Sequence, residues 1–495
     1  AKNDGENARL YNAVKAVSDF AIDLGINIPT GKDSLSMTQK YPDGNTVFSP
    51  GTVIISAVGE VTDIKKAVSP VIKTILGTKL VYIDLSNSKY ELGGSSFAQS
   101  LNKIGSISPD VSDAKYFSKA FNAVQSMLTD GKILAGHDIS AGGMITTLLE
   151  MNFANCDHGM EIDLSDLGEN DIVRLLFSEN PGIIIQVSDD DSLHELNKQG
   201  ITYHIIGEVI PDRKISLDHN QKKYVFDIDR LRNIWFHTSY SMDRKQSTEG
   251  TAHCRYKNYS KQDLHYNFNS KFSGKPEDLG IEMSRRSNSG TRAAIIREKG
   301  VNGDREMAYA LHLAGFDVKD VHMTDLISGR EDLSDVNMIV FVGGFSNSDV
   351  LGSAKGWAGA FKYNEKANTA LKNFFKREDT LSVGICNGCQ LWMELDLINP
   401  EHDVHGKMTY NDSKKHESSF TSVEIQKNNS VMLSTLEGSK LGVWMSHGEG
   451  KFNLPLDENQ YNIVAKYGYE GYPHNPNGSD FNTAMMCDTT GRHLV

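Results

Sequence analysis

The 495-residue sequence has few cysteines, no long apolar run and no excess of positive charge. Its five cysteines are too few for a disulfide framework in so long a chain, which favours a reducing, cytoplasmic setting. No apolar run approaches the roughly 20 residues of a membrane span, and the opening AKNDGENARL lacks the apolar core of a signal peptide. With 51 basic against 64 acidic side chains, the net charge of −13 argues against binding to nucleic acid, although a small phosphorylated ligand needs only a local pocket.

The length exceeds what one hydrophobic core normally holds, and the composition of 39% hydrophobic and 23% charged residues is typical of a globular protein. We predict four regions. Residues 1–66 are the C-terminal part of a lobe that begins upstream, and 67–235 form a lobe in which a sheet is covered by helices. Residues 236–289 are polar with scattered aromatics, which favours a linker that wraps over neighbouring domains, with disorder as the alternative. Residues 290–495 form an α/β domain. A start without methionine that runs straight into a helix is typical of a fragment.

Periodicity places the elements of the first two regions. Apolar residues at Leu10, Val14, Val17 and Ala21 predict an amphipathic helix in ARLYNAVKAVSDFAIDLGI. The further predicted elements are a glycine-rich turn over Thr30–Ser36, strands over Thr52–Val58, Lys79–Leu85, Ile133–Ala135 and PGIIIQVS, a turn into a helix in ELGGSSFAQSLNKIG, a loop GHDISAGG, and a helix over Met144–Phe153.

From residue 290 onward, short strands alternate with helices, which predicts a parallel, doubly wound sheet with reactive groups at the carboxyl ends of its strands. The predicted strands are Arg292–Arg297, Val318–Met323, Asn337–Val342 and Leu381–Ile385. The predicted helices are Arg305–Ala314, Lys366–Lys376 and Gly388–Leu397.

The segment LSVGICNGCQLWMEL carries the strongest chemical signal. An apolar strand runs into Cys386, which is flanked by small residues, and a helix follows at once. This arrangement is typical of a nucleophile elbow, in which the backbone turns too sharply for larger neighbours. We predict that Cys386 is a nucleophile, that the positive end of the following helix favours its thiolate, and that the backbone N–H of Asn387 donates to an oxyanion.

A second glycine-rich loop, Gly343-Gly344-Phe345, follows the strand NMIVFV and can supply the other half of an oxyanion hole. Cys386 and Cys389 also form a Cys-x-x-Cys pair, which is found in zinc sites and redox dithiols. Zinc needs a second pair, which the sequence lacks, and no thioredoxin-like unit surrounds the motif; Cys389 fits a buried structural role. The elbow by itself leaves cysteine peptidases and several glutaminases open.

Taken together, several longer motifs resemble large-type phosphoribosylformylglycinamidine synthase over nearly the whole chain. The glutaminase part of the resemblance rests on REKGVNGDREMAYALHLAGFDVKDVHMTDL, GGFSNSDVLGSAKGWAGAF, GICNGCQ, SHGEGKF and NPNGS; the synthetase part rests on GKDSLSM, LGGSSFAQ, HDISAGGM and TSYSMDR. The resemblance implies an α/β and α+β multidomain fold, with an aminoimidazole-ribonucleotide-synthetase-like lobe followed by a doubly wound class I glutaminase domain. It also implies a Cys-His-Glu triad whose nucleophile is Cys386.

The resemblance places the triad His and Glu in a Pro-His-Pro-Glu-Arg motif that is absent from this sequence, which ends at TTGRHLV. We therefore expect the chain alone to be inactive as a glutaminase. His447 and Glu449 of SHGEGKF are expected to line the glutamine pocket, with a triad pair or a solvated loop as alternatives. The family pattern Asn-x-Ser-x-x-Phe-Glu-x-Arg is only partly kept: Asn411, Ser413 and Glu417 are present, whereas His416 and Ser419 replace Phe and Arg. The oxyanion and glutamine pocket is predicted to comprise Gly344, Phe345, Asn387, Gly388, His447 and Glu449.

In the synthetase part, the loop GHDISAGG offers a carboxylate, a hydroxyl and glycine N–H groups before a helix. An ordinary helix cap would have the same residues, but the resemblance assigns Asp138 to Mg²⁺ and Ser140 to a nucleotide. Lys32 and Ser34 of Gly31-Lys32-Asp33-Ser34 form a second candidate phosphate contact, although the P-loop spacing is absent and a solvated turn is an equal alternative. Gly93-Gly94-Ser95 is a weaker candidate.

The implied activity is the glutamine- and ATP-dependent conversion of formylglycinamide ribonucleotide to formylglycinamidine ribonucleotide in purine biosynthesis. Expected partners are glutamine, ATP, the ribonucleotide and the remainder of the same polypeptide upstream and downstream, with Mg²⁺ as cofactor and a structural ADP as a further option. Two alternatives are another class I amidotransferase or cysteine hydrolase, and a non-catalytic nucleotide-binding module.

Overall fold

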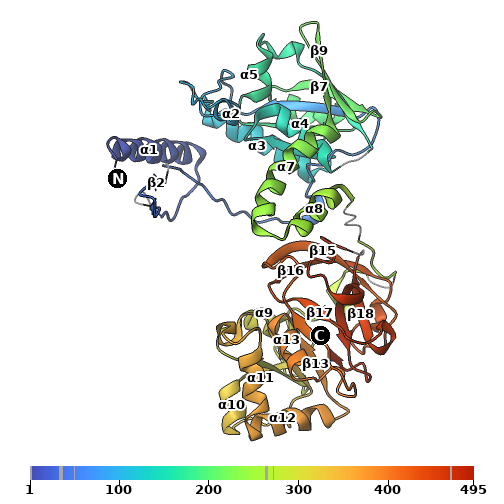
Figure 1. Ribbon diagram of the computed structural model, residues 1–495. Helices are drawn as coiled ribbons and strands as arrows, with labels where there is room; N and C mark the ends of the chain where they lie inside the picture. Colours follow the sequence, from blue (N-terminus) through green and yellow to red (C-terminus); the bar gives the residue numbers. More distant parts are fainter. Residues whose placement is uncertain are drawn as a thin grey trace. The chain divides into compact units, whose positions relative to one another are not determined.

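The computed structural model describes residues 3–32, 37–49, 51–154, 157–261, 266–270, 273–468 and 471–495. The chain divides into two compact units, residues 1–235 and 236–495 (Figure 1). One helix, α7 (Ile228–Gln246), crosses the boundary between them. None of the helices in the described ranges is both long enough and apolar enough to cross a membrane.

The first unit contains a seven-stranded sheet with the strand order β4-β6-β3-β7-β5-β8-β9, and all its neighbours are antiparallel except β5 and β8. Its helices are α1 (Glu6–Leu24), α2 (Ser96–Ser100), α3 (Ala114–Thr129), α4 (Gly143–Phe153), α5 (Ile172–Phe177) and α6 (His194–Lys198). Its strands are β1 (Thr38–Lys40), β2 (Thr46–Phe48), β3 (Lys79–Asp84), β4 (Ala135–Ile139), β5 (Gly159–Asp163), β6 (Gly182–Val187), β7 (His204–Ile210), β8 (Lys214–His219) and β9 (Lys222–Asp227).

The central strand β3 buries both of its faces because successive side chains point to opposite sides of a sheet. Leu80 and Tyr82 pack in the core that contains residues of α4 and α5, whereas Val81 and Ile83 pack with residues of α3 and α6. The sheet therefore has helices on both faces, which confirms the predicted α+β character of this lobe.

Three predictions for the first unit were wrong. The strand predicted over Ile133–Ala135 lies later in the chain, since β4 begins only at Ala135. Residues 52–58, predicted as a strand, lie outside any helix or strand, and Ile54 and Val58 are exposed. Their β-branched composition favours extended backbone, but no strand pairing of the described residues includes them. The predicted loop GHDISAGG begins as strand, because β4 includes Asp138, which is paired with Ile183 of β6.

The second unit contains a nine-stranded sheet with the order β11-β10-β12-β13-β20-β19-β18-β15-β16. Its helices are α8 (Glu249–Asn258), α9 (Asp304–Leu313), α10 (Met323–Ser328), α11 (Lys355–Lys362), α12 (Glu365–Lys376) and α13 (Asn387–Glu394). Its strands are β10 (Arg292–Arg297), β11 (Asp317–His322), β12 (Met338–Phe341), β13 (Leu381–Gly384), β14 (Lys407–Thr409), β15 (Glu417–Ile425), β16 (Lys440–His447), β17 (Lys451–Asn453), β18 (Asn462–Tyr467), β19 (Thr483–Cys487) and β20 (His493–Leu494).

Only one half of this sheet is parallel. Strands β11, β10, β12 and β13 run parallel, as predicted, and β20 adds a fifth parallel strand. The remaining four strands extend the sheet in antiparallel fashion. Helices cover both faces of the parallel half: Trp357 of α11 and Phe374 of α12 pack on the face that buries Phe341, and Leu311 of α9 packs on the face that buries Val340. This half is the doubly wound sheet that the alternation of strands and helices predicted.

The region predicted as a linker begins with helix, since α7 continues to Gln246 and α8 follows after two residues. Aromatic rings pack between the two segments: Tyr240 stacks on Tyr256 of α8 at a centroid distance of 4.7 Å, and Phe236 stacks on Tyr259, the residue directly after α8, at 4.0 Å. The spacing of four residues between Phe236 and Tyr240 is a helical signal that the polar composition of the segment obscured.

Gly388 is required where α13 packs on β12. A Cβ atom at this position would lie 2.1 Å from the carbonyl oxygen of Phe341, which belongs to backbone and cannot move aside. We predict that Gly388→Ala lowers the free energy of unfolding of the whole chain by about 3 kcal/mol or more. Denaturant unfolding followed by the fluorescence of the buried Trp357 and Trp392 measures the change.

The matched control is Gly359→Ala in α11, where the new Cβ would meet only ordinary contacts with the ring of Tyr363, 3.8 Å away. Because alanine favours helix over glycine by about 1 kcal/mol, this change should leave stability unchanged or raise it. Equal stability of the two variants would contradict the close packing at Gly388.

Candidate active site

A sharp turn joins β13 to α13 and carries Cys386. Cys386 has φ 55° and ψ −110°, a backbone conformation that residues other than glycine rarely adopt. Gly384, two residues before Cys386, is small for a steric reason: a Cβ at this position would lie 2.5 Å from the ring of Trp392. A non-glycine residue held in this strained conformation at a strand-to-helix turn is typical of an enzymatic nucleophile.

The backbone N–H groups of Gly344 and Asn387 lie near the sulfur of Cys386, where they lower the pKa of its thiol. Gly344 lies in the loop after β12 and has φ 119°, which glycine adopts without strain. The neighbouring N–H of Phe345 is used elsewhere, because it donates to the carbonyl oxygen of Gly300 at 2.9 Å. The arrangement gives a developing oxyanion next to the sulfur two donors, one from each loop.

Burial raises the pKa of the Cys386 thiol above its ordinary value. The N–H groups of Gly344 and Asn387 lower the pKa, and the carboxylate of Asp349 raises it further. The N–H donors therefore act in the direction that the helix terminus predicted, but removal of the sulfur from water outweighs them.

The side chain of Asn387 fixes the position of the two loops. Its Oδ1 accepts the backbone N–H of Ser346 at 3.2 Å, and its Nδ2 donates to Gln390 at 2.9 Å and to Asp349 at 3.3 Å. Asn387 is completely buried, so that these bonds are shielded from water. Gln390 in turn donates to the carbonyl oxygen of Glu449 at 2.9 Å.

The segment Ser446–Gly450, which we call the pocket loop, thus reaches α13 through Gln390. His447 stands at the end of β16 and is half-buried. Burial, together with the nearby imidazole of His416, lowers the pKa of His447 to about 4, so this side chain is neutral at pH 7. Among the described residues, no hydrogen bond joins His447 to Cys386. The structure brings His447 and Glu449 to the helix that carries the nucleophile, but not to the sulfur as a base.

Cys389 is separated from this chemistry by burial. It is 8% exposed, packs in the core with Trp392 and Phe341, and burial raises the pKa of its thiol strongly. Within the described parts of the chain, no three His, Cys, Asp or Glu side chains are grouped as metal ligands would be. Cys389 is therefore placed as a core residue.

In the first unit, Asp138 and Ser140 lie at the end of β4 and both are exposed. The Asp138 carboxylate is 3.1 Å from Nδ1 of His137, and Nε2 of His137 is 3.0 Å from Glu150. The carbonyl oxygen of Ser140 accepts the N–H of Gly143 at 3.0 Å and closes the turn into α4. Lys32 is exposed and lies outside helices and strands, and Ser34 lies outside the described residues.

Glu179 is a residue that sequence reasoning missed. One of its carboxylate oxygens accepts the backbone N–H of Ser96 at 2.7 Å and that of Gly142 at 2.8 Å, so it joins the two glycine-rich turns. With Gly93 and Gly94 it lines a cavity of about 460 Å³. No local motif marks Glu179, because its partners lie 83 and 37 residues away in the sequence.

Comparison with known proteins follows the same division of the chain. Residues 290–495 match the CobB/CobQ-like glutamine amidotransferase domain, residues 77–220 match the C-terminal domain of AIR synthase related proteins, and residues 1–60 match the FGAR-AT PurM_N-like domain. The doubly wound sheet with Cys386 at its elbow is thus a glutamine amidotransferase domain, and it shares its chain with an AIR synthase-like lobe.

Curated relatives match the entire chain. A probable phosphoribosylformylglycinamidine synthase of Arabidopsis thaliana, described as chloroplastic/mitochondrial, is 38% identical, a probable enzyme of the same name from Caenorhabditis elegans is 38% identical, and the Homo sapiens phosphoribosylformylglycinamidine synthase is 36% identical. In each case 100% of this chain is covered, but only 36%, 40% and 39% of the relative. Over its whole length the chain is similar to phosphoribosylformylglycinamidine synthases, and it spans about two fifths of the length of these relatives.

The raised pKa of Cys386 generates a prediction about its reactivity. Because the thiolate is the reacting form, Cys386 should react with iodoacetamide more slowly at pH 7 than the exposed Cys254 of α8, and its rate should still rise with pH above about 9. Peptide mass spectrometry after timed labelling of the folded chain measures both rates at once, with Cys254 as the internal reference. Labelling of the buried Cys389 at a rate equal to that of Cys386 would contradict the placement of the two thiols.

Proposed function

We propose that this chain supplies the glutaminase nucleophile and part of the nucleotide site of an enzyme that converts formylglycinamide ribonucleotide to formylglycinamidine ribonucleotide with glutamine and ATP. The observation that carries the proposal is the strained strand-to-helix turn at Cys386, which places its sulfur near the N–H groups of both Gly344 and Asn387. The family relationship supports the wider reaction, because the three relatives carry this synthase name.

In the glutaminase reaction, the Cys386 sulfur attacks the side-chain amide carbon of glutamine. The new S–C bond places negative charge on the amide oxygen, where the N–H groups of Gly344 and Asn387 donate to it. The C–N bond then breaks, the nitrogen takes up a proton and leaves as ammonia, and a thioester remains. Water hydrolyses the thioester, which releases glutamate and restores the thiol.

Proton transfer needs a group besides those described at the elbow. Attack requires the removal of a proton from a thiol whose pKa burial has raised, and departure of ammonia requires a proton on its nitrogen. His447 is neutral at pH 7. Among the described residues, it forms no hydrogen bond with Cys386. The family resemblance assigns this task to a His-Glu pair in a Pro-His-Pro-Glu motif that the sequence does not contain.

For the nucleotide part, we propose that Asp138 faces a metal ion and that Ser140 contacts the nucleotide, with Lys32 and Ser34 as phosphate contacts. The side chain of Asp138 is 71% exposed, so its carboxylate is open to a hard cation. This fits Mg²⁺, which binds through one or two carboxylates and phosphate oxygens and would there neutralise phosphate charge. Glu179 holds the turns of Gly93–Ser96 and Ala141–Gly143 together, and with Gly93 and Gly94 it lines the cavity beside them.

The proposal also covers the substrates of the chain and the remaining parts of the enzyme. Ammonia released at Cys386 is the nitrogen donor for the synthetase reaction, in which ATP activates the amide oxygen of the ribonucleotide. The remaining parts of a full-length synthase, upstream and downstream, would complete both sites. A cytoplasmic setting stays a prediction, and the plant relative shows by its name that the family also occurs in organelles.

Two variants of a full-length synthase that contains this sequence test whether glutamine hydrolysis and synthesis depend on separate sites. Cys386→Ala should lower glutamine-dependent synthesis by roughly 10⁴-fold or more and leave ammonium-dependent synthesis intact. Asp138→Asn should abolish synthesis from either nitrogen source, while glutamine hydrolysis remains measurable. Separate assays of glutamate release and of ribonucleotide product distinguish the two effects.

Matched controls are Cys254→Ala, which removes an exposed thiol of the second unit, and Asp212→Asn, which neutralises an exposed carboxylate of the first. Both should behave as the unchanged enzyme. Glutamine-dependent synthesis by Cys386→Ala at the original rate, or ammonium-dependent synthesis by Asp138→Asn at the original rate, would refute the assignment of the respective site.

A further inference from the structure

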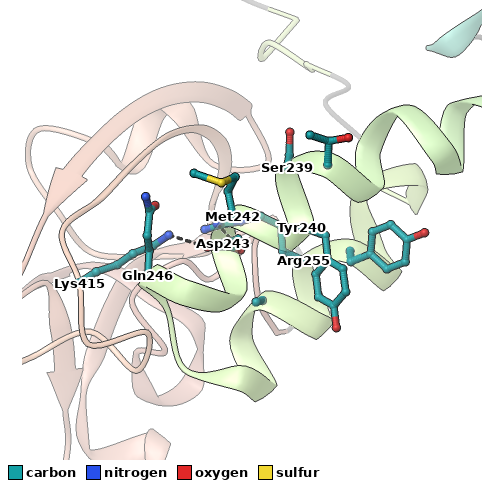
Figure 2. Close-up of a pocket in the computed structure, with 10 residues that line it drawn as sticks. Ser239, Tyr240, Met242, Asp243, Gln246, Arg255 and Lys415 are labelled. Atoms are coloured by element: carbon teal, nitrogen blue, oxygen red, sulfur yellow. Dashed lines mark hydrogen bonds and ion pairs between the residues drawn. The ribbon is translucent and has the colours of Figure 1, made fainter. Parts of the chain in front are cut away.

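The motif TSYSMDR, residues 238–244, is not used by the proposed chemistry. It lies on α7, and five of its residues help to line a cavity of about 360 Å³ between α7, α8 and the turn before β15 (Figure 2). None of the elbow residues lines this cavity. The charged side chains that meet there are Asp243 of the motif, Arg255 of α8 and Lys415 of the turn.

Asp243 is the centre of this group. It is 8% exposed, and its Oδ1 accepts Nζ of Lys415 at 2.8 Å and Oγ of Ser247 at 2.5 Å, while its Oδ2 accepts Nη1 of Arg255 at 2.8 Å. Burial by itself raises the pKa of Asp243, but these donors reverse the effect and the pKa lies below the ordinary value. Figure 2 shows Lys415 reaching from the strand-rich side of the unit to Asp243 on α7.

Arg255 binds a second buried carboxylate with its other nitrogen. Its Nη2 donates to Oε2 of Glu417 at 2.7 Å, and Glu417 is only 3% exposed. The hydroxyl of Tyr472 donates to the other oxygen of Glu417 at 2.9 Å, and the guanidinium lies 4.8 Å from the centre of the Tyr472 ring. Because a guanidinium is rigid and planar, these bonds fix α8 and the first residue of β15 at one separation.

The residues held by this group are in direct contact with the pocket loop. Glu417 is paired with His447 in the β15–β16 ladder. Between them, the buried side chain of Asn411 donates to the carbonyl oxygens of Lys415 at 3.1 Å and His447 at 2.6 Å, and accepts the N–H of Gly450 at 3.1 Å. A displacement of Lys415 or Glu417 therefore displaces the backbone at His447.

The pocket loop is connected to the nucleophile on its other side. The carbonyl oxygen of Glu449 accepts from Gln390, and Gln390 accepts from Asn387, which follows Cys386 directly and whose backbone N–H lies near its sulfur. An unbroken series of hydrogen bonds and strand pairs thus leads from Arg255 to the oxyanion donors.

We propose that Arg255 is a positioning residue for glutamine hydrolysis: held between Asp243 of α7 and Glu417 of β15, it sets the position of the pocket loop without contacting glutamine. This inference rests on the proposed glutaminase function of Cys386. It assigns a role to Asp243 and to the TSYSMDR motif as the anchor of Arg255 on α7. Without Arg255, the buried carboxylate of Asp243 would keep Lys415, but that of Glu417 would lose its cation and keep the hydroxyl of Tyr472. The turn before β15 would then shift to bring water to Glu417.

The test uses a full-length synthase and compares Arg255→Met, Arg255→Lys and Glu417→Gln. We expect kcat/KM for glutamine to fall roughly 10–100-fold in Arg255→Met, mainly through KM, because small displacements of binding groups have effects of this size. Ammonium-dependent synthesis should be unchanged. Arg255→Lys keeps the charge but not the two-sided geometry, so it should show an intermediate loss, and Glu417→Gln, which keeps the shape, should raise KM as well.

A second readout separates positioning from folding. A chloroketone analogue of glutamine should alkylate Cys386 of Arg255→Met more slowly in proportion to the loss in kcat/KM, whereas iodoacetamide, which needs no pocket loop, should react at the original rate. Arg292→Met is the matched control, since it breaks the exposed pair with Asp335 in the same unit and should alter neither rate. Arg255→Met combined with Asn411→Ala should lose less than the product of the single losses, because both act on the same loop.

Unchanged KM and analogue labelling in the folded variants would overturn the inference while leaving the proposed function intact. A fall in both alkylation rates that merely follows the fraction of unfolded protein would also overturn it, and would reduce Arg255 to a structural contact. If Arg255→Met does not fold, the KM and the analogue labelling of Arg255→Lys and Glu417→Gln provide the same test. If the unchanged enzyme neither releases glutamate nor is labelled at Cys386, the proposed function itself is wrong.

Discussion

The strained backbone at Cys386 is the constraint on which the geometry of the site depends. With φ 55° at a residue that carries a side chain, the turn from β13 to α13 places the sulfur beside Gly343 in the loop after β12. Such a conformation persists only when its surroundings enforce it. Here the close packing of Gly384 on Trp392 and of Gly388 on Phe341 leaves the chain no wider path. The two oxyanion donors, Gly344 and Asn387, have their positions because this turn has its shape.

The same packing has an electrostatic consequence. A turn pressed against the sheet removes the sulfur from water, and this burial raises the pKa of the thiol more than the two N–H donors lower it. The N–H groups are therefore better suited to the oxyanion, which develops during the reaction, than to a resting thiolate. The thiol therefore needs a general base that removes its proton. This agrees with a triad in which nucleophile and base come from separate segments of the chain.

Much of this could be predicted from the sequence wherever the signal was local. The strand, Cys386 and the helix after it are contiguous, and the parallel strands β10, β11, β12 and β13 are apolar runs bounded by helices. The rise in the pKa of the Cys386 thiol had no sequence signal, because burial depends on residues from other strands and helices. The antiparallel strands after residue 400 were missed because their half-exposed faces mix polar and apolar residues, as in β15.

Contacts between distant segments had no sequence signal at all. Arg255 and Glu417 are 162 residues apart, and Asp243 and Lys415 are 172 apart, so only the fold shows that they form one group. Glu179 was missed for the same reason. The motif TSYSMDR could be recognised as a motif, yet its part in the structure became visible only when Asp243 was placed beside two cations from other elements.

The central claim, that Cys386 is the nucleophile that attacks glutamine, is tested most directly by trapping the covalent intermediate. A full-length synthase in which this sequence occupies its place would be mixed with glutamine, quenched in acid during turnover and digested, and its peptides analysed by mass spectrometry. The account predicts a γ-glutamyl thioester on the peptide that contains Cys386, located by fragmentation to that sulfur and absent from the Cys386→Ala variant. A glutamyl group on Cys389 or on any other residue, in an enzyme that is releasing glutamate, would contradict it.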